Sequence, residues 1–157
     1  MPISSEKRRH DGRFSYRHLL DDHFVLVCPQ DDPLAQTADQ PVAWSAFASR
    51  PFVAVMNGSN TRAATDAAFV RAGLNIRPAH EVASNNLPLI GSMIAAGLGV
   101  SALPRSALSF LGQPSLVGRP LQKPVMSRRI GILHLADRSQ SASVREFCQY
   151  LEDVINE

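Results

Sequence analysis

Two short polar segments carry the side chains best suited to binding a small molecule. Ser59, Asn60 and Thr61 follow one apolar run, and Ser84 and Asn85 follow another. Each segment precedes residues with helical spacing, and free N–H groups at a helix start favour an anion. Hydroxyl and amide groups can also donate or accept hydrogen bonds. These residues therefore favour binding of a carboxylate, although Ser, Thr and Asn are equally the usual N-caps of helices.

No motif for catalysis or metal binding is found in the sequence. Cys28 and Cys148 lie inside apolar runs, where cysteines usually behave as small buried hydrophobes. The five histidines are scattered, and the pair Asp21-Asp22 is expected at the surface. Gly97-Leu98-Gly99 ends a helix and enters a strand, whereas a dinucleotide fingerprint leaves a strand and opens a helix. We therefore expect no enzymatic activity, no cofactor and no metal.

The elements that must position the polar segments alternate between strand and helix. Strands are predicted over 24–28, 52–56, 79–83, 100–103 and 129–135, and helices over 61–72, from Asn86 to Gly97, and from Ser143 onward. This alternation predicts an α/β fold with a mainly parallel sheet. The continuous apolar run 24–28 is typical of a parallel strand buried on both faces. Both polar segments would then lie at the carboxyl edge of the sheet, where ligands bind in open α/β folds.

The overall composition is that of a soluble globular protein. The chain has 157 residues, 45% of them hydrophobic, and a formal net charge of +2, which is too weak to indicate nucleic-acid binding. Residues 1–16 are predicted to be disordered or loosely ordered. The basic start is not followed by an apolar stretch, so we expect no signal peptide, no membrane span and a cytoplasmic protein.

Several ordered stretches resemble the C-terminal effector-binding domain of LysR-type transcriptional regulators. They are residues 19–27 with 32–35, 51–53 with 60–62, 81–84 with 95–104, and 128–132 with Phe147. The stretch 95–104, AAGLGVSALP, is the most specific of them. Together they cover roughly residues 17–155.

The resemblance implies a type 2 periplasmic-binding-protein-like fold, in which two lobes flank a cleft and the chain crosses between them twice. Residues 17–157 would form the effector-binding domain. Within it, 30–127 would be a complete second lobe, and 17–29 with 128–157 a partial first lobe, truncated on its N-terminal side.

The resemblance also implies a function. A small organic acid or similar metabolite would bind in the cleft and modulate transcription, with Ser101 near the hinge as a further contact. The domain would pair with a second copy and would not touch DNA or membrane itself, since a winged helix-turn-helix binds DNA in the intact regulators. Three alternatives stay open: a stand-alone solute-binding module of a transporter, an enzyme on the same scaffold, and a truncated remnant without ligand binding.

Overall fold

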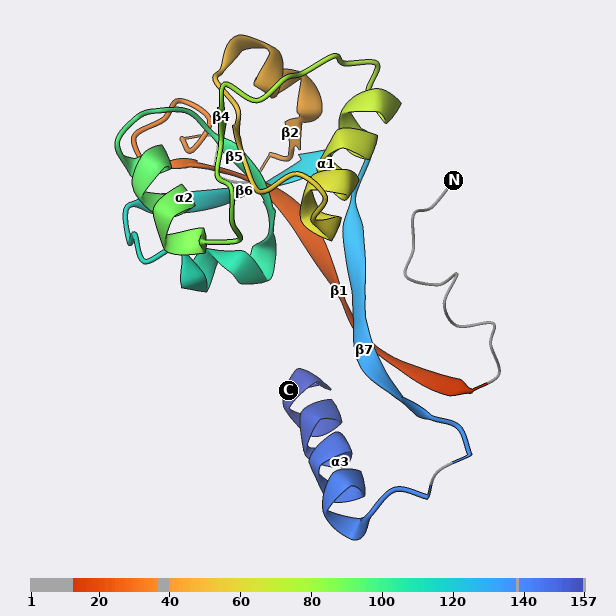
Figure 1. The fold of residues 1–157 in the computed structure, drawn as a ribbon. Coiled ribbons are helices and arrows are strands. Elements are labelled where there is room, and N and C mark those ends of the chain that lie inside the picture. The colour runs from red at the N-terminus through yellow and green to blue at the C-terminus, as the bar shows by residue number, and fades with distance from the viewer. Residues whose placement is uncertain (1–12, 37–39, 138, 157) are drawn as a thin grey trace. The chain divides into compact units, whose positions relative to one another are not determined.

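The computed structural model describes residues 13–36, 40–137 and 139–156. The described residues form two compact units, one within Asp22–Arg128 and the other made of the described residues on either side. The elements, in chain order (Figure 1), are β1 (Phe14–Pro29), β2 (Val42–Ala43), η2 (Trp44–Ser49), β3 (Val53–Ala54), α1 (Asn60–Arg71), β4 (His80–Glu81), α2 (Leu87–Ala95), β5 (Ser101–Pro104), η3 (Arg105–Phe110), β6 (Leu116–Gln122), β7 (Ser127–Leu135) and α3 (Ala142–Asn156). This order confirms the predicted α/β class.

The sheet of unit 22–128 is mixed, so the prediction of a mainly parallel sheet is wrong for its central strand. The strand order is β2-β6-β1-β5, with β7 also paired to β1. β1 runs antiparallel to both β5 and β6, while β2 runs parallel to β6. β3 pairs with β4 in parallel, and a parallel bridge joins Phe52 to Val100. The apolar run 24–28 arises from burial on both faces, which an antiparallel strand between two helical layers achieves equally well.

Side chains of β1 divide between two hydrophobic clusters on opposite faces of the sheet. Phe24, Leu26 and Cys28 join the cluster that contains α1. Val25 and Val27 join the cluster that contains α2. Figure 1 accordingly shows α1 and α2 on different sides of these strands. The α1 side is filled by four aromatic rings, those of Trp44, Phe47, Phe52 and Phe69, with centroids 5.2–5.8 Å apart.

Polar N-caps and a glycine turn set the limits of the helices. Ser59 caps α1, its hydroxyl accepting from the Arg62 N–H at 3.1 Å, and Asn86 caps α2 in the same way through Leu89 N–H. At the end of α2, Gly97 N–H donates to Ile94 O and Leu98 N–H to Met93 O, which is a Schellman motif. The predicted helix-ending role of Gly97 is therefore confirmed.

Gly99 has a different role from Gly97. Its φ is +147°, and a Cβ at this position would overlap the carbonyl oxygen of Pro51. The next residue, Val100, donates its N–H to that same oxygen at 2.9 Å. Glycine is therefore required here because the chain entering β5 passes against the chain entering β3.

The second unit contains the outer parts of β1 and β7 together with α3. Ala136 N–H donates to Arg13 O at 2.8 Å, and Arg17 forms an ion pair with Glu152 of α3. On α3, Cys148 is buried, but Phe147 is 60% and Val154 49% exposed. Apolar side chains of this helix, Val144, Phe147, Val154 and Ile155, are thus largely exposed in the described part of the chain.

The segment 1–16 that the sequence predicts to be loose is only partly described. Residues 1–12 lie outside the described residues. Residues 14–16 belong to β1, so the prediction is wrong for them. β1, to which they belong, pairs with β7, and nothing in the local sequence indicates a partner so distant in the chain.

We expect Gly99→Ala to destabilise the protein more than Gly97→Ala. At Gly97 (φ +78°) a Cβ meets no other atom, so alanine should cost only the left-handed backbone strain of about 1–2 kcal/mol. At Gly99 the overlap with Pro51 adds to a disfavoured φ, for a total of about 3 kcal/mol or more. Urea unfolding of both variants measures the difference, and equal losses would contradict the assigned contact.

Candidate functional site

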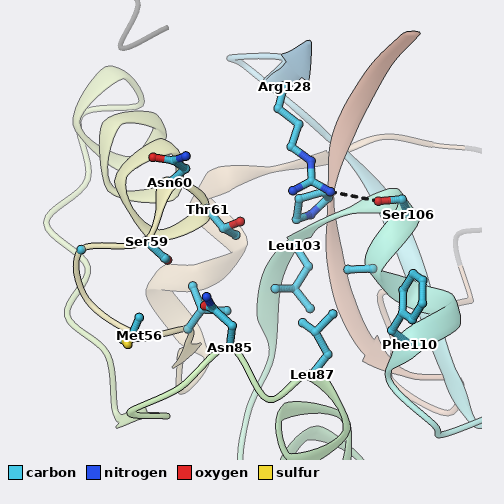
Figure 2. Close-up of a pocket in the computed structure, with 14 residues that line it drawn as sticks. Met56, Ser59, Asn60, Thr61, Asn85, Leu87, Leu103, Ser106, Phe110 and Arg128 are labelled. Carbon is cyan, nitrogen blue, oxygen red and sulfur yellow. Dashed lines mark hydrogen bonds between the residues drawn. The ribbon is translucent and has the colours of Figure 1, made fainter. Parts of the chain in front are cut away.

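A pocket of about 640 Å³ lies within unit 22–128. Its walls come from the start of α1, the loop after β4, the start of α2, the end of β5, and η3, with Arg128 of β7 reaching in (Figure 2). The described lining contains polar side chains on the α1 side and apolar ones such as Leu87, Leu103 and Phe110 elsewhere. No carboxylate is among these lining residues.

Ser59, Asn60, Thr61 and Asn85 all line this pocket. The parallel register of β3 and β4 brings them together, because Val53 pairs with His80 and Ala54 with Glu81. The loops that leave the two strands therefore emerge at the same edge, as the sequence predicts.

The start of α1 has hydrogen-bond donors that the helix leaves unused. The hydroxyl of Ser59 is occupied as the N-cap by the Arg62 N–H. Ala63 N–H donates to Ser59 O at 3.0 Å, so the regular helical bonds begin there. The N–H groups of Asn60 and Thr61 precede that bond, and the first turn carries no acidic residue. The local potential therefore favours a negative group.

Two other residues predicted at the site, Ser84 and Ser101, are not brought into the pocket. Ser84 is exposed, and its hydroxyl accepts from the Asn86 N–H at 3.3 Å. Ser101 is 1% exposed within β5, opposite Val27. Its side chain therefore lies in the interior beside β1, and the contact near the hinge that the resemblance implies for Ser101 is not among the residues lining this pocket.

Arg128, Ser106 and Asp22 form a cluster that no local pattern in the sequence predicts. Arg128 Nε donates to Asp22 Oδ2 at 2.9 Å, and its Nη2 donates to Ser106 Oγ at 3.1 Å, the bond drawn in Figure 2. Ser106 donates to Asp22 through its hydroxyl at 2.7 Å and through its backbone N–H at 3.1 Å. Arg128 and Ser106 line the pocket, and Asp22 lies behind them.

Asp22 is buried, so the expectation that Asp21-Asp22 lies at the surface is wrong for this residue. Its side chain is 3% exposed, whereas that of Arg128 is 47% exposed. Burial by itself would raise the pKa of Asp22. The hydrogen bonds from Ser106 and Arg128, with the charge of Arg128, outweigh burial and leave the pKa below its ordinary value.

The thiol of Cys28 is poorly suited to chemistry. Burial, with a smaller contribution from nearby Asp32, raises the pKa of Cys28 to about 11. Cys28 and Cys148 are both free and buried, as the sequence predicts. Within 13–36, 40–137 and 139–156, no group of His, Cys, Asp and Glu side chains is arranged to hold a metal ion. None of the helices in these ranges is long and apolar enough to cross a bilayer.

Comparison with known families gives one match over nearly the whole chain. The model of the LysR substrate binding domain matches residues 3–156. The uncharacterized HTH-type transcriptional regulator YbhD of Escherichia coli is 30% identical over 137 residues, which are 87% of this chain and 42% of YbhD. The chain thus spans less than half of that relative.

Solved structures of regulatory domains have the same fold. The regulatory domain of CcmR from Synechocystis, solved in complex with 2-PG, is 28% identical with a TM-score of 0.75 over 94% of this chain and 70% of CcmR's. The BenM effector binding domain, at 16% identity, has a TM-score of 0.70 over 93% of this chain and 65% of its own, and this likeness concerns the fold alone. The predicted periplasmic-binding-protein-like type 2 fold is confirmed.

We expect Asp22→Asn to lower stability at neutral pH and to reduce its pH dependence. Because folding lowers the pKa of Asp22, its stabilising contribution is complete above about pH 4 and is lost as the pH falls further. Loss of the charged hydrogen bonds should cost about 1.5–3 kcal/mol at pH 7. Urea unfolding at pH 7 and pH 3 measures the difference in unfolding free energy between the variant and the unmodified protein. This difference should be smaller at pH 3.

Asp31→Asn is the matched control, since Asp31 is exposed. It should leave stability nearly unchanged at both pH values. An Asp22→Asn variant that behaves like this control would show that the cluster contributes nothing to folding.

Proposed function

The chain belongs to the family of LysR substrate-binding domains, and from that premise we propose that its pocket binds a small organic acid as the effector of a transcriptional regulator. The observation that carries this proposal is the pocket beside the α1 start, lined by Ser59, Asn60, Thr61 and Asn85.

A carboxylate is the ligand group that the α1 wall suits best. The N–H groups of Asn60 and Thr61 and the α1 dipole attract an anion, and the Thr61 hydroxyl and Asn85 amide can donate further hydrogen bonds. The pocket lining contains no carboxylate that would repel it. Binding by hydrogen bonds around one anionic group also fixes the orientation of the ligand.

The remaining walls suit a compact carbon skeleton. Leu87, Leu103 and Phe110 contribute apolar surface to the pocket. A volume of about 640 Å³ lies in the usual range for metabolite sites. CcmR, at 28% identity, binds 2-PG through the same kind of domain, which supports a small-molecule effector here.

At the level of the whole regulator, the proposal follows the family. Effector binding would favour the states of the protein for which the effector has the higher affinity, and so alter transcription. DNA would be bound by a winged helix-turn-helix outside this chain, and the sensing domain would pair with a second copy in the cytoplasm. This chain spans 42% of YbhD, so DNA binding and transcriptional control are proposals about the whole regulator.

We also propose that unit Asp22–Arg128 corresponds to the lobe predicted over 30–127. The flanking residues would belong to the partial first lobe. Ser59, Asn60, Thr61 and Asn85 would then be the contacts of one lobe alone, with Ser84 and Ser101 outside the contact set.

We expect Thr61→Ala and Asn85→Ala each to weaken acid binding about tenfold or more, the effect of losing one hydrogen bond to a charged group. Small organic acids, with 2-PG among them, would first be screened by their effect on the unfolding temperature of the chain. Titration calorimetry of an acid that stabilises the protein then gives the affinities.

Asn75→Ala is the matched control for Asn85→Ala, because Asn75 is exposed and does not line the pocket. Its affinity should equal that of the unmodified chain. A screen in which no acid raises the unfolding temperature would refute the proposed function. Unchanged affinity in both pocket variants would show that Thr61 and Asn85 do not contact the ligand.

A further inference from the structure

Arg128 is the only charged side chain among the described residues that line the pocket. It comes from the start of β7 and, in Figure 2, reaches into the space between the α1 start and η3. Its side chain is half exposed, whereas that of its partner Asp22 is buried. A cation fixed at the wall of a pocket without lining carboxylates is an anion-binding feature separate from the α1 start.

The hydrogen bonds of Arg128 occupy one edge of its guanidinium. Nε and Nη2, which form the side edge, donate to Asp22 and Ser106. Guanidinium has five N–H donors, so the two on Nη1 and one on Nη2 remain for other acceptors. Those on Nη1 and Nη2 form the end edge, a fork that matches the two oxygens of a carboxylate.

The cluster also holds the fork in place before a ligand binds. Asp22 accepts from Arg128 Nε at 2.9 Å and from the hydroxyl and backbone N–H of Ser106, so the carboxylate cannot rotate without breaking several bonds. A guanidinium held in this way loses less conformational entropy on binding than a free arginine side chain. Asp22 and Ser106 are therefore positioning residues for Arg128.

We propose that Arg128 binds a second anionic group of the effector through its end edge, so that the pocket selects small acids with an anionic group at each end. This inference rests on the proposed function, which assigns the first anionic group to the α1 start. Leu87, Leu103 and Phe110, which line the same pocket, would contact the carbon chain between the two groups. Short dicarboxylates are the simplest ligands of this class.

The test compares dicarboxylates with monocarboxylates of equal carbon number on the full chain. The probes are succinate with butyrate, glutarate with pentanoate, and adipate with hexanoate, with affinities measured from amide chemical shifts in NMR titrations. At least one dicarboxylate should bind about tenfold more tightly than its partner, the value of one charge-assisted hydrogen bond at a half-exposed site. Arg128→Gln should reduce this ratio to near one.

Two further variants guard against a purely structural effect. Arg128→Lys keeps a positive charge near Asp22 but lacks the fork, so the ratio of dicarboxylate to monocarboxylate affinity should also fall. If Arg128→Gln does not fold, this variant tests the role of Arg128 in its place. Arg105→Gln removes an equal charge from an exposed neighbour of Ser106 outside the pocket lining and should keep the full ratio.

The outcomes separate the two proposals. Equal affinities within every pair, with Thr61→Ala still weakening binding, would overturn the role of Arg128 and leave the proposed function standing. A dicarboxylate preference that persists in Arg128→Gln or Arg128→Lys would also overturn it. Absence of binding by every acid would refute both.

Discussion

Burial of the strand segment 24–28 on both faces is the constraint on which the larger unit depends. All five side chains from Phe24 to Cys28 are at most 2% exposed. They alternate between the aromatic cluster under α1 and the aliphatic cluster under α2. A strand buried this way must be hydrogen-bonded on both edges, and β5 and β6 supply those bonds. Pairing with β1 therefore fixes the position of β5, and with it the start of η3, which follows β5 directly in the chain.

The antiparallel register of β1 also assembles the charged cluster of the pocket. Phe24 of β1 pairs with Pro104 of β5. Asp22 lies two residues before Phe24, and Ser106 lies two residues after Pro104. The same antiparallel register therefore places Asp22 opposite Ser106. On the other edge Phe24 N–H donates to Met126 O, with Ala136 bonded to Arg13 farther out, so Arg128 arrives beside Asp22 by the same geometry. Three distant segments meet because both pairings are antiparallel.

This explains which part of the site could be predicted from sequence. Ser59, Asn60, Thr61 and Asn85 follow neighbouring parallel strands, and a local pattern of strand, polar turn and helix was enough to place them together. Asp22, Ser106 and Arg128 carry no such pattern, since 84 and 106 residues separate Asp22 from its partners. An apolar run buried on both faces looks alike in parallel and antiparallel sheets. The error in strand direction therefore hid the cluster as well.

The position in which the cluster holds the Arg128 side chain explains it better than its contribution to stability does. A buried carboxylate costs free energy unless its oxygens are fully bonded, and apolar pairs of similar size often stabilise a fold as well as buried ion pairs do. Both carboxylate oxygens of Asp22 are hydrogen-bonded, by donors from Ser106 and Arg128. Its effect on Arg128 is to fix a long, half-exposed side chain by one edge while the other stays available. A contact preset by the register of β1, β5 and β7 is more rigid than one on a loop, and such rigidity favours discrimination between ligands by charge spacing.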